Sequence, residues 1–196
     1  MIAYFNDIMK TVKESLNSLD ESQFKRLVVH CTKCIDNGGK IVVSGLGKNV
    51  PICEKFVGTM NSLGMDARFL HTNTAVHGDL GMVGKNDIVL LLSKSGNTEE
   101  SVKLAYYLNE RGTETWLLSF NKRSKLMSII KEHLILDLKN EGDEWDIVPN
   151  NSTTVYLILL QGLAMQVCQE RGVTLNDFKV NHPGGGIGAK LRGEVL

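Results

Sequence analysis

Apolar residues recur along this chain in two different rhythms. In the first 36 residues they stand three or four positions apart, which is the spacing of amphipathic helices. The first such set is Phe5, Ile8, Met9, Val12 and Leu16, and the second runs from Phe24 to Ile35. Asn37, Gly38 and Gly39 end the second set, because glycine adopts the left-handed conformation that closes a helix. We therefore expect two leading helices within residues 1–36.

From residue 40 onwards, short apolar runs alternate with helical patterns. The runs predict strands at 40–44, 67–70, 88–92, 115–119 and 134–138, and the segments between them predict helices at 52–63, 98–110, 124–131 and 153–171. Apolar strands separated by helices are typical of a parallel sheet covered on both faces. We therefore predict an α/β fold, a doubly wound five-stranded parallel sheet sandwiched by helices. Residues 1–196 form a single domain on this reading, with its core at 40–191.

Composition and charge exclude several classes of protein. Hydrophobic residues make up 42%, charged residues 22%, and the formal net charge is zero, so a broad basic face for nucleic acid is not indicated. No apolar run approaches the roughly 18 residues of a membrane span, and the first residues lack the basic flank of a signal peptide. We expect a cytoplasmic protein without a membrane partner. Cys31 and Cys34 lie within the second helical pattern, no second pair completes a zinc site, and we expect no metal.

In doubly wound folds, ligands bind beyond the carboxyl ends of the strands, which directs attention to the segments after Ser44, Leu92 and Leu138. The first of these segments is glycine-rich and reads SGLGKN from residue 44 to 49. It lacks the third glycine of a dinucleotide fingerprint, where Val50 stands, and its spacing is too short for a P-loop. Taken alone, it is equally consistent with a tight turn and with a ligand loop.

The segment after Leu92 reads SKSGNT from residue 93 to 98 and leads into a helical pattern. A purely structural explanation is a capping box, with Asn97 as the N-cap and Glu100 three residues later. That explanation has no need of Ser93, Ser95 and Gly96. Hydroxyl groups, free backbone N–H groups and a helix dipole together bind an anion well, so the segment favours phosphate, although Glu99 and Glu100 count against this unless they point away.

Four segments together resemble the sugar isomerase (SIS) domain family, and within it the bacterial arabinose 5-phosphate isomerases. They are the phosphate loop at 93–98, the histidine segment at 71–83 with HGDLGMV, the PNNSTT loop at 149–154 and the HPGGGIG motif at 182–188. The similarity runs from about Lys40 to Leu191. Many relatives continue into a pair of regulatory CBS modules, and we expect a form without them.

The resemblance implies an aldose–ketose isomerase that interconverts D-ribulose 5-phosphate and D-arabinose 5-phosphate through an enediol intermediate. Its product would supply the synthesis of Kdo, an acidic sugar of Gram-negative surface polysaccharides. The resemblance also implies a homotetramer, a dimer of dimers whose sites are lined by neighbouring subunits, without a cofactor or a metal. Independently of it, residues 153–168 are apolar on nearly every side, and a helix of this kind needs cover that a partner subunit can provide.

The family's functional positions carry over residue by residue. The implied catalytic residues are Lys48, His77, Glu141 and His182. The implied substrate-binding residues are Ser44, Gly45, Gly47, Asn49, Ser93, Ser95, Gly96, Asn97 and Thr98. Lys48 would neutralise the phosphate or the enediolate oxygen. The other three catalytic residues would move protons, and which of them takes the carbon-bound proton stays open; His30 and His133 we interpret as structural.

Three features of this assignment stay open. Glu141 is placed by counting back from Ser152, and a different loop length would shift the choice to Asp143 or Glu144. Relatives commonly have serine where this chain has Asn49. They also commonly have glutamate where it has Asn97, which cannot act as a base. Either that acid is dispensable, or Glu99 or Glu100 replaces it, or the substrate differs. The alternative functions are an isomerase of another sugar phosphate, or a non-catalytic sugar-phosphate-binding SIS protein.

Overall fold

The computed structural model describes residues 1–193 and contains the predicted five-stranded parallel sheet. The strands are β1 (Ile41–Gly45), β2 (Ala67–His71), β3 (Ile88–Leu92), β4 (Glu114–Ser119) and β5 (Glu132–Ile135). Their order across the sheet is β2-β1-β3-β4-β5, and every neighbouring pair is parallel. The chain therefore winds outward from β1 in one direction and from β3 in the other, which is the doubly wound topology.

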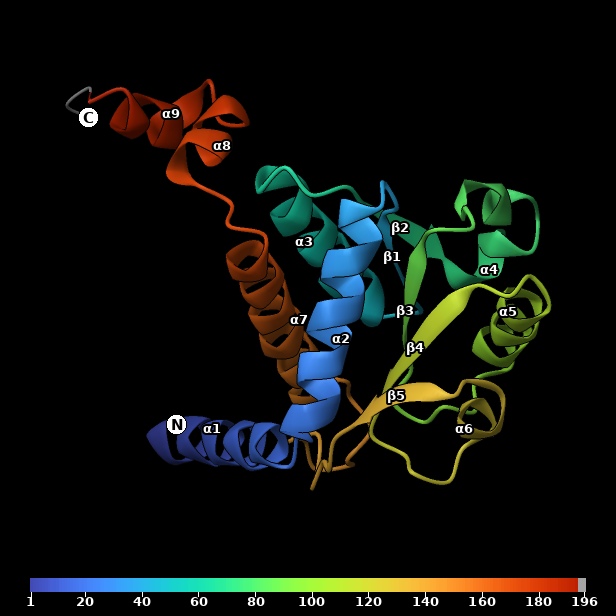
Figure 1. The fold of residues 1–196 in the computed structure, drawn as a ribbon. Coiled ribbons are helices and arrows are strands. Elements are labelled where there is room, and N and C mark those ends of the chain that lie inside the picture. The colour runs from blue at the N-terminus through green and yellow to red at the C-terminus, as the bar shows by residue number, and fades with distance from the viewer. Residues whose placement is uncertain (194–196) are drawn as a thin grey trace.

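Helices follow the strands in the predicted alternation (Figure 1). They are α1 (Ile2–Asn17), α2 (Glu21–Asp36), α3 (Asn49–Ser62), α4 (Thr72–Ala75), α5 (Glu99–Glu110), α6 (Lys125–Ile129), α7 (Asn151–Glu170), α8 (Leu175–Val180) and α9 (Gly185–Leu191). A short 3₁₀ turn spans Asp79–Met82. None of the described helices has the length and apolar content needed to cross a membrane.

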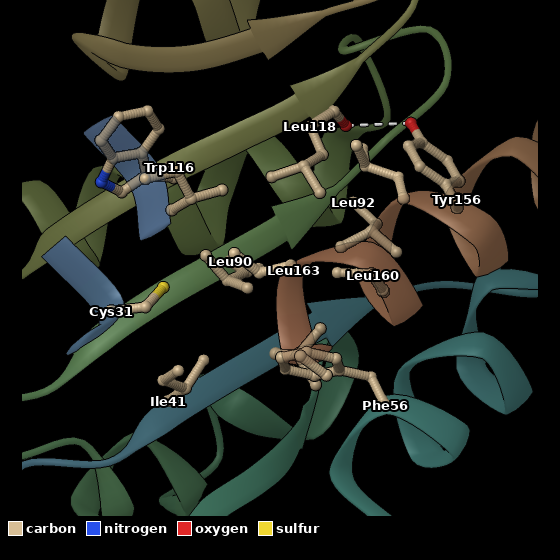
Figure 2. Packing of buried hydrophobic residues seen from close by; sticks show 14 of the residues in the cluster. Cys31, Ile41, Phe56, Leu90, Leu92, Trp116, Leu118, Tyr156, Leu160 and Leu163 are labelled. Atoms are coloured by element: carbon tan, nitrogen blue, oxygen red, sulfur yellow. Dashed lines mark hydrogen bonds between the residues drawn. The ribbon is translucent and has the colours of Figure 1, made fainter. Parts of the chain in front are cut away.

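The sheet is buried on both faces, and its side chains alternate between two cores. Ile41 and Val43 of β1 belong to the larger core, which α2, α3 and α7 cover, whereas Val42 belongs to the core under α5 and α6. Figure 2 shows the larger core, where the Tyr156 hydroxyl donates a 2.9 Å hydrogen bond to the Leu118 carbonyl. Because both faces are covered, the strands read as nearly continuous apolar runs in the sequence.

Cys31 and Cys34 are buried helix residues of α2, as expected. Burial raises the pKa of both thiols, that of Cys34 to about 11, and the Cys34 thiol donates to the Asn86 carbonyl at 3.2 Å. No cluster of side chains suited to hold a metal ion occurs among residues 1–193. Buried thiols with raised pKa values are poor nucleophiles, so the pair contributes mainly to packing.

Several predicted boundaries are wrong. Helix α3 begins three residues earlier than expected, because Pro51 is tolerated in a first turn, where no intrahelical N–H bond is needed. Strand β5 ends at Ile135 although apolar residues continue to Leu138, since the chain leaves the edge of the sheet there. The glycine-rich segment after His182 forms the short helix α9, which its composition did not indicate.

Helix α7 is covered on one side only. Val155, Leu159 and Leu163 are buried against the sheet side, whereas Ile158 and Met165 are 41% and 48% exposed. Within one chain, the expected burial of α7 is therefore confirmed only for the side that faces the sheet. Cover of the remaining side by a partner subunit stays a prediction.

Candidate active site at the carboxyl edge of the sheet

The parallel register brings the predicted ligand segments to one edge of the sheet. Gly45, at the end of β1, lies opposite Leu92, at the end of β3. The segment 45–49 and the segment 93–98 therefore leave the sheet side by side, and each leads into a helix, α3 and α5 respectively. This edge is where a doubly wound fold binds its ligands.

The segment 93–98, which resembles the phosphate loop of SIS domains, is stabilised by hydrogen bonds to its own hydroxyl groups. The Gly96 N–H donates to Ser93 Oγ and the Asn97 N–H donates to Ser95 Oγ, each at 3.2 Å. Gly96 has a φ of +63°, and a Cβ there would collide with the Ser124 side chain, so only glycine fits. Because both serine oxygens accept these bonds, each hydroxyl keeps its proton for donation to a ligand.

The predicted capping box of Asn97 and Glu100 is wrong, because the N-cap of α5 is Thr98. Asn97 Oδ1 instead accepts a 2.9 Å hydrogen bond from the Lys125 N–H, which ties the loop to the start of α6. Within residues 1–193 the Thr98 hydroxyl does not cap α5, and both Thr98 and Ser95 are exposed. The two hydroxyls and the first N–H groups of α5 thus form a surface suited to an anion.

The segment 45–49 is a tight turn with an exposed lysine. Gly47 has a φ of +57°, and a Cβ on Gly45 would come within 2.9 Å of the Asn49 Cβ. Lys48 is exposed at the N-cap of α3. Ser44 is fully buried and shares a 2.9 Å hydrogen bond with the Thr72 hydroxyl. Ser44 therefore supports the turn from the sheet side, and the substrate contact expected from the sequence stays a prediction.

Glu141 lies in the loop after β5 and is completely buried. Its Oε2 accepts hydrogen bonds from the backbone N–H groups of Asn150 at 3.1 Å and Ser152 at 2.9 Å, at the N-terminus of α7. The Lys94 ammonium lies 2.6 Å from Oε1. A carboxylate is buried at acceptable cost only with such partners, and here they come from the phosphate loop and from a helix N-terminus.

The two alternative acids of this loop have other surroundings. Asp143 accepts hydrogen bonds from the N–H groups of Trp145, Ile147 and Val148 at 3.0–3.3 Å. Desolvation acts to raise the pKa of the Asp143 carboxyl, but these N–H groups outweigh it and hold the pKa below its ordinary value. Glu144 is exposed. Of the three acids, the geometry favours Glu141 as the one built into the site.

Lys94 is the residue that sequence reasoning missed. It stands between Ser93 and Ser95, and no role was assigned to it from the sequence. No local signal links it to Glu141, which lies 47 positions further along the chain and meets it only through the parallel sheet.

His77 lies near the same edge but on its outer side. It is exposed just after α4 and lines a hollow of about 340 Å³ together with Glu100 and Lys103 from the first turns of α5. The hollow is open, and its lining does not include the hydroxyls of the phosphate loop.

His182 lies at the opposite end of the molecule. Its Nε2 is 2.8 Å from Ser62 Oγ at the last residue of α3, and its Nδ1 is 2.8 Å from the Phe178 carbonyl oxygen. Helix α3 has 14 residues and is therefore about 20 Å long, with Lys48 before its first residue and Ser62 at its last. Figure 1 shows α8 and α9 at the far end of α7, away from the sheet. Lys48 and His182 of one chain are thus too far apart to contact one substrate.

A five-stranded α/β sandwich with a serine- and glycine-rich loop after β3 and a buried glutamate at the same edge is the combination that this structure shows. The SIS domain model matches residues 35–165, and the chain belongs to this family. Within the family it is similar to the arabinose 5-phosphate isomerases KdsD of Salmonella typhi, 32% identical over 94% of this chain, and of Pseudomonas aeruginosa, 35% identical over 82%. It spans only about half the length of these relatives, 56% and 49%.

A solved structure extends the similarity to three dimensions. The Escherichia coli CFT073 protein c3406, in complex with arabinose 5-phosphate, has a TM-score of 0.85 and 32% sequence identity to this chain. The match covers 92% of this chain and 94% of the other, so most of the described fold has a counterpart there.

Proposed function

We propose that this chain is a sugar-phosphate isomerase that interconverts D-ribulose 5-phosphate and D-arabinose 5-phosphate. The observation that carries the proposal is the buried Glu141 carboxylate, held by backbone N–H groups beside an anion-binding loop. The similarity to two arabinose 5-phosphate isomerases and to a protein in complex with arabinose 5-phosphate supports the choice of substrate.

The substrate phosphate binds at the loop 93–98 in this proposal. Ser95 and Thr98 donate their hydroxyl protons, and the first N–H groups of α5 add further donors aligned with the helix dipole. Asn49, at the first position of α3, has an amide N–H₂ in place of the hydroxyl common in relatives, and this group also donates. When the phosphate is bound at this loop, the carbonyl end of the sugar can extend along the carboxyl edge of the sheet.

The chemical step is proton transfer between two adjacent carbons and their oxygens. A base removes the proton beside the carbonyl, which gives an enediol-like intermediate with negative charge on oxygen. Glu141 is the carboxylate that moves protons, and the Lys48 ammonium stabilises the developing negative charge. No step of this scheme requires a metal or an organic cofactor.

His182 acts in the site of a neighbouring subunit, because within its own chain it lies at the other end of α3. The ring orientation of His182 is defined by two hydrogen bonds. Nδ1 of the neutral ring donates to the Phe178 carbonyl oxygen and Nε2 accepts from the Ser62 hydroxyl, so the bond to Ser62 has to open before Nε2 takes a proton in that site. His77, exposed at the outer side of the edge, is a second group for a site shared between subunits. A dimer of dimers, with the free side of α7 in an interface, fits both histidines.

The product would serve the synthesis of Kdo in the cytoplasm. The experiment that tests the proposed function is to incubate purified protein with a panel of pentose and hexose phosphates and to identify the products by NMR. We expect arabinose 5-phosphate from ribulose 5-phosphate, and the reverse conversion. Turnover of a different sugar phosphate would change the substrate, and turnover of none would refute the function.

A further inference from the structure

The contact between Lys94 and Glu141 joins the two halves of the proposed site. Lys94 belongs to the phosphate loop, whereas Glu141 belongs to the loop before α7. Their ion pair has an N–O distance of 2.6 Å, and the Lys94 side chain is 42% exposed whereas that of Glu141 is fully buried. The lysine side chain thus extends from the solvent-exposed edge to a carboxylate that is itself excluded from solvent.

The backbone of Lys94 is anchored independently of this ion pair. Its carbonyl oxygen accepts hydrogen bonds from the Phe120 N–H at 3.3 Å and from the Ser119 hydroxyl at 3.1 Å, both at the end of β4. The Asn121 side chain holds the next carbonyl, that of Ser95, at 2.9 Å. The backbone from which the Lys94 side chain extends is therefore fixed to the end of β4.

The two oxygens of the carboxylate are held by different parts of the molecule. Oε2 is fixed by two backbone N–H groups of α7, whereas Oε1 faces the lysine. The backbone bonds fix Oε2, and a partner on Oε1 adds a second point that restricts the orientation of the carboxylate. Positioned acid–base groups depend on such orientation, because an error of about 1 Å lowers the rate strongly.

We propose that Lys94 is a positioning residue for Glu141 and that it acts on proton transfer through this carboxylate, without being a phosphate ligand. The inference rests on the proposed function. A lysine in a phosphate loop is ordinarily expected to contact the phosphate. The inference instead gives Lys94 a role in orienting Glu141.

The experiment separates these roles by kinetics with ribulose 5-phosphate. We expect K94M to lower kcat about tenfold to hundredfold, because the carboxylate loses the ammonium that lies 2.6 Å from its Oε1 and with it part of its orientation, while KM stays within about twofold of wild type. We expect K94R, which keeps the charge and the donor, to recover most of the lost rate. The matched control is K85M, an exposed lysine just before the amino end of β3, which we expect to leave kcat and KM unchanged.

A double-mutant cycle with Glu141 tests the path of the effect. If Lys94 acts through the carboxylate, K94M/E141Q is no slower than E141Q alone, because the charge that the lysine orients is already absent. The double variant also guards against misfolding, since it removes the unpaired buried carboxylate that K94M leaves behind. Thermal melting of all variants identifies any that fail to fold.

Each remaining outcome overturns a distinct statement. A K94M variant that raises KM alone makes Lys94 a phosphate ligand and overturns the inference. A K94M variant with wild-type kinetics, or one that slows E141Q by the same factor as wild type, also overturns it. Wild-type protein that isomerises no sugar phosphate refutes the proposed function, and the inference with it.

Discussion

The carboxyl edge of the sheet and the C-terminal segment around His182 both contain residues proposed for proton transfer, but the structure builds them differently. At the edge, Glu141 is fully buried, and its partners come from the phosphate loop and from α7 of the same chain. In the C-terminal segment, His182 is only half-buried, stacked on Phe178 with ring centroids 3.9 Å apart, on short helices that lie away from the sheet.

The difference agrees with the proposal that one chain completes only part of the site. The edge is organised by long-range contacts of the sheet, so its geometry is fixed within a single subunit. His182 has an equally defined ring orientation but nothing to act on within reach, because α3 separates it from the edge. We therefore expect variants at the two regions to differ in one property above all, whether a second subunit can rescue them.

The largest effect is expected at the edge. Glu141→Gln should lower kcat by a factor of about 10²–10⁴, the contribution typical of a positioned acid or base, while KM changes little. Glutamine keeps the shape but cannot exchange protons usefully. Steady-state kinetics and deuterium exchange at the sugar C2 measure the effect. Glu144→Gln, an exposed acid of the same loop, is the control, and wild-type rates for E141Q would shift the assignment to Asp143 or Glu144.

Combining a variant of the edge with a variant of the C-terminal segment tests whether the two regions act in one shared site. His182→Asn should also lower kcat, by about 10² or more. Co-expression of E141Q with H182N should then restore activity well above that of either variant, because a mixed assembly contains one site with both native residues. Light scattering should find at least a dimer. If His182 served its own chain's site, no mixed assembly would contain an intact site, and activity would stay at the level of the parents.

A smaller effect is expected at the phosphate loop. Ser95→Ala and Thr98→Val should each lower kcat/KM about tenfold to hundredfold, since a hydrogen bond to a charged group contributes roughly 1.5–3 kcal/mol. Most of the loss should appear in KM, which distinguishes these variants from E141Q and from H182N. Circular dichroism should show an unchanged fold. Wild-type KM in both variants would remove phosphate binding from this loop.

The smallest effect is expected at Asp143, the neighbour that supports the loop of Glu141. Asp143→Asn should change kcat by less than about threefold, the small effect expected of a group outside the proton path. Its folded-state pKa is lowered, so the charged carboxylate contributes stability above its ordinary pKa of ~3.9 and loses that contribution as the pH falls through the lowered value.

Urea unfolding at several pH values checks this prediction for Asp143. Wild type and D143N should differ most at neutral pH and converge at acid pH. A difference that is constant from neutral to acid pH would exclude the carboxylate as its origin.

The sequence alone determined the layers of the fold and supplied the candidate site residues. Strand β3 was predicted at its observed bounds, and the other strands within a few residues, because strands buried on both faces leave unbroken apolar runs. The glycines at 47 and 96 marked turns that require positive φ. Both signals are local, since they depend on a residue's own conformation or on the burial of a short segment.

Only the tertiary structure decided which of these residues meet. The partner of Glu141 was not predictable, because Lys94 and Glu141 are brought together by the order of β3, β4 and β5. The burial of Ser44 against Thr72 and the replacement of Asn97 by Thr98 as the N-cap of α5 depend likewise on neighbouring elements. Most of all, the HPGG motif made His182 a candidate but did not give its location, since a motif indicates chemistry whereas the length and packing of α3 and α7 set the distance.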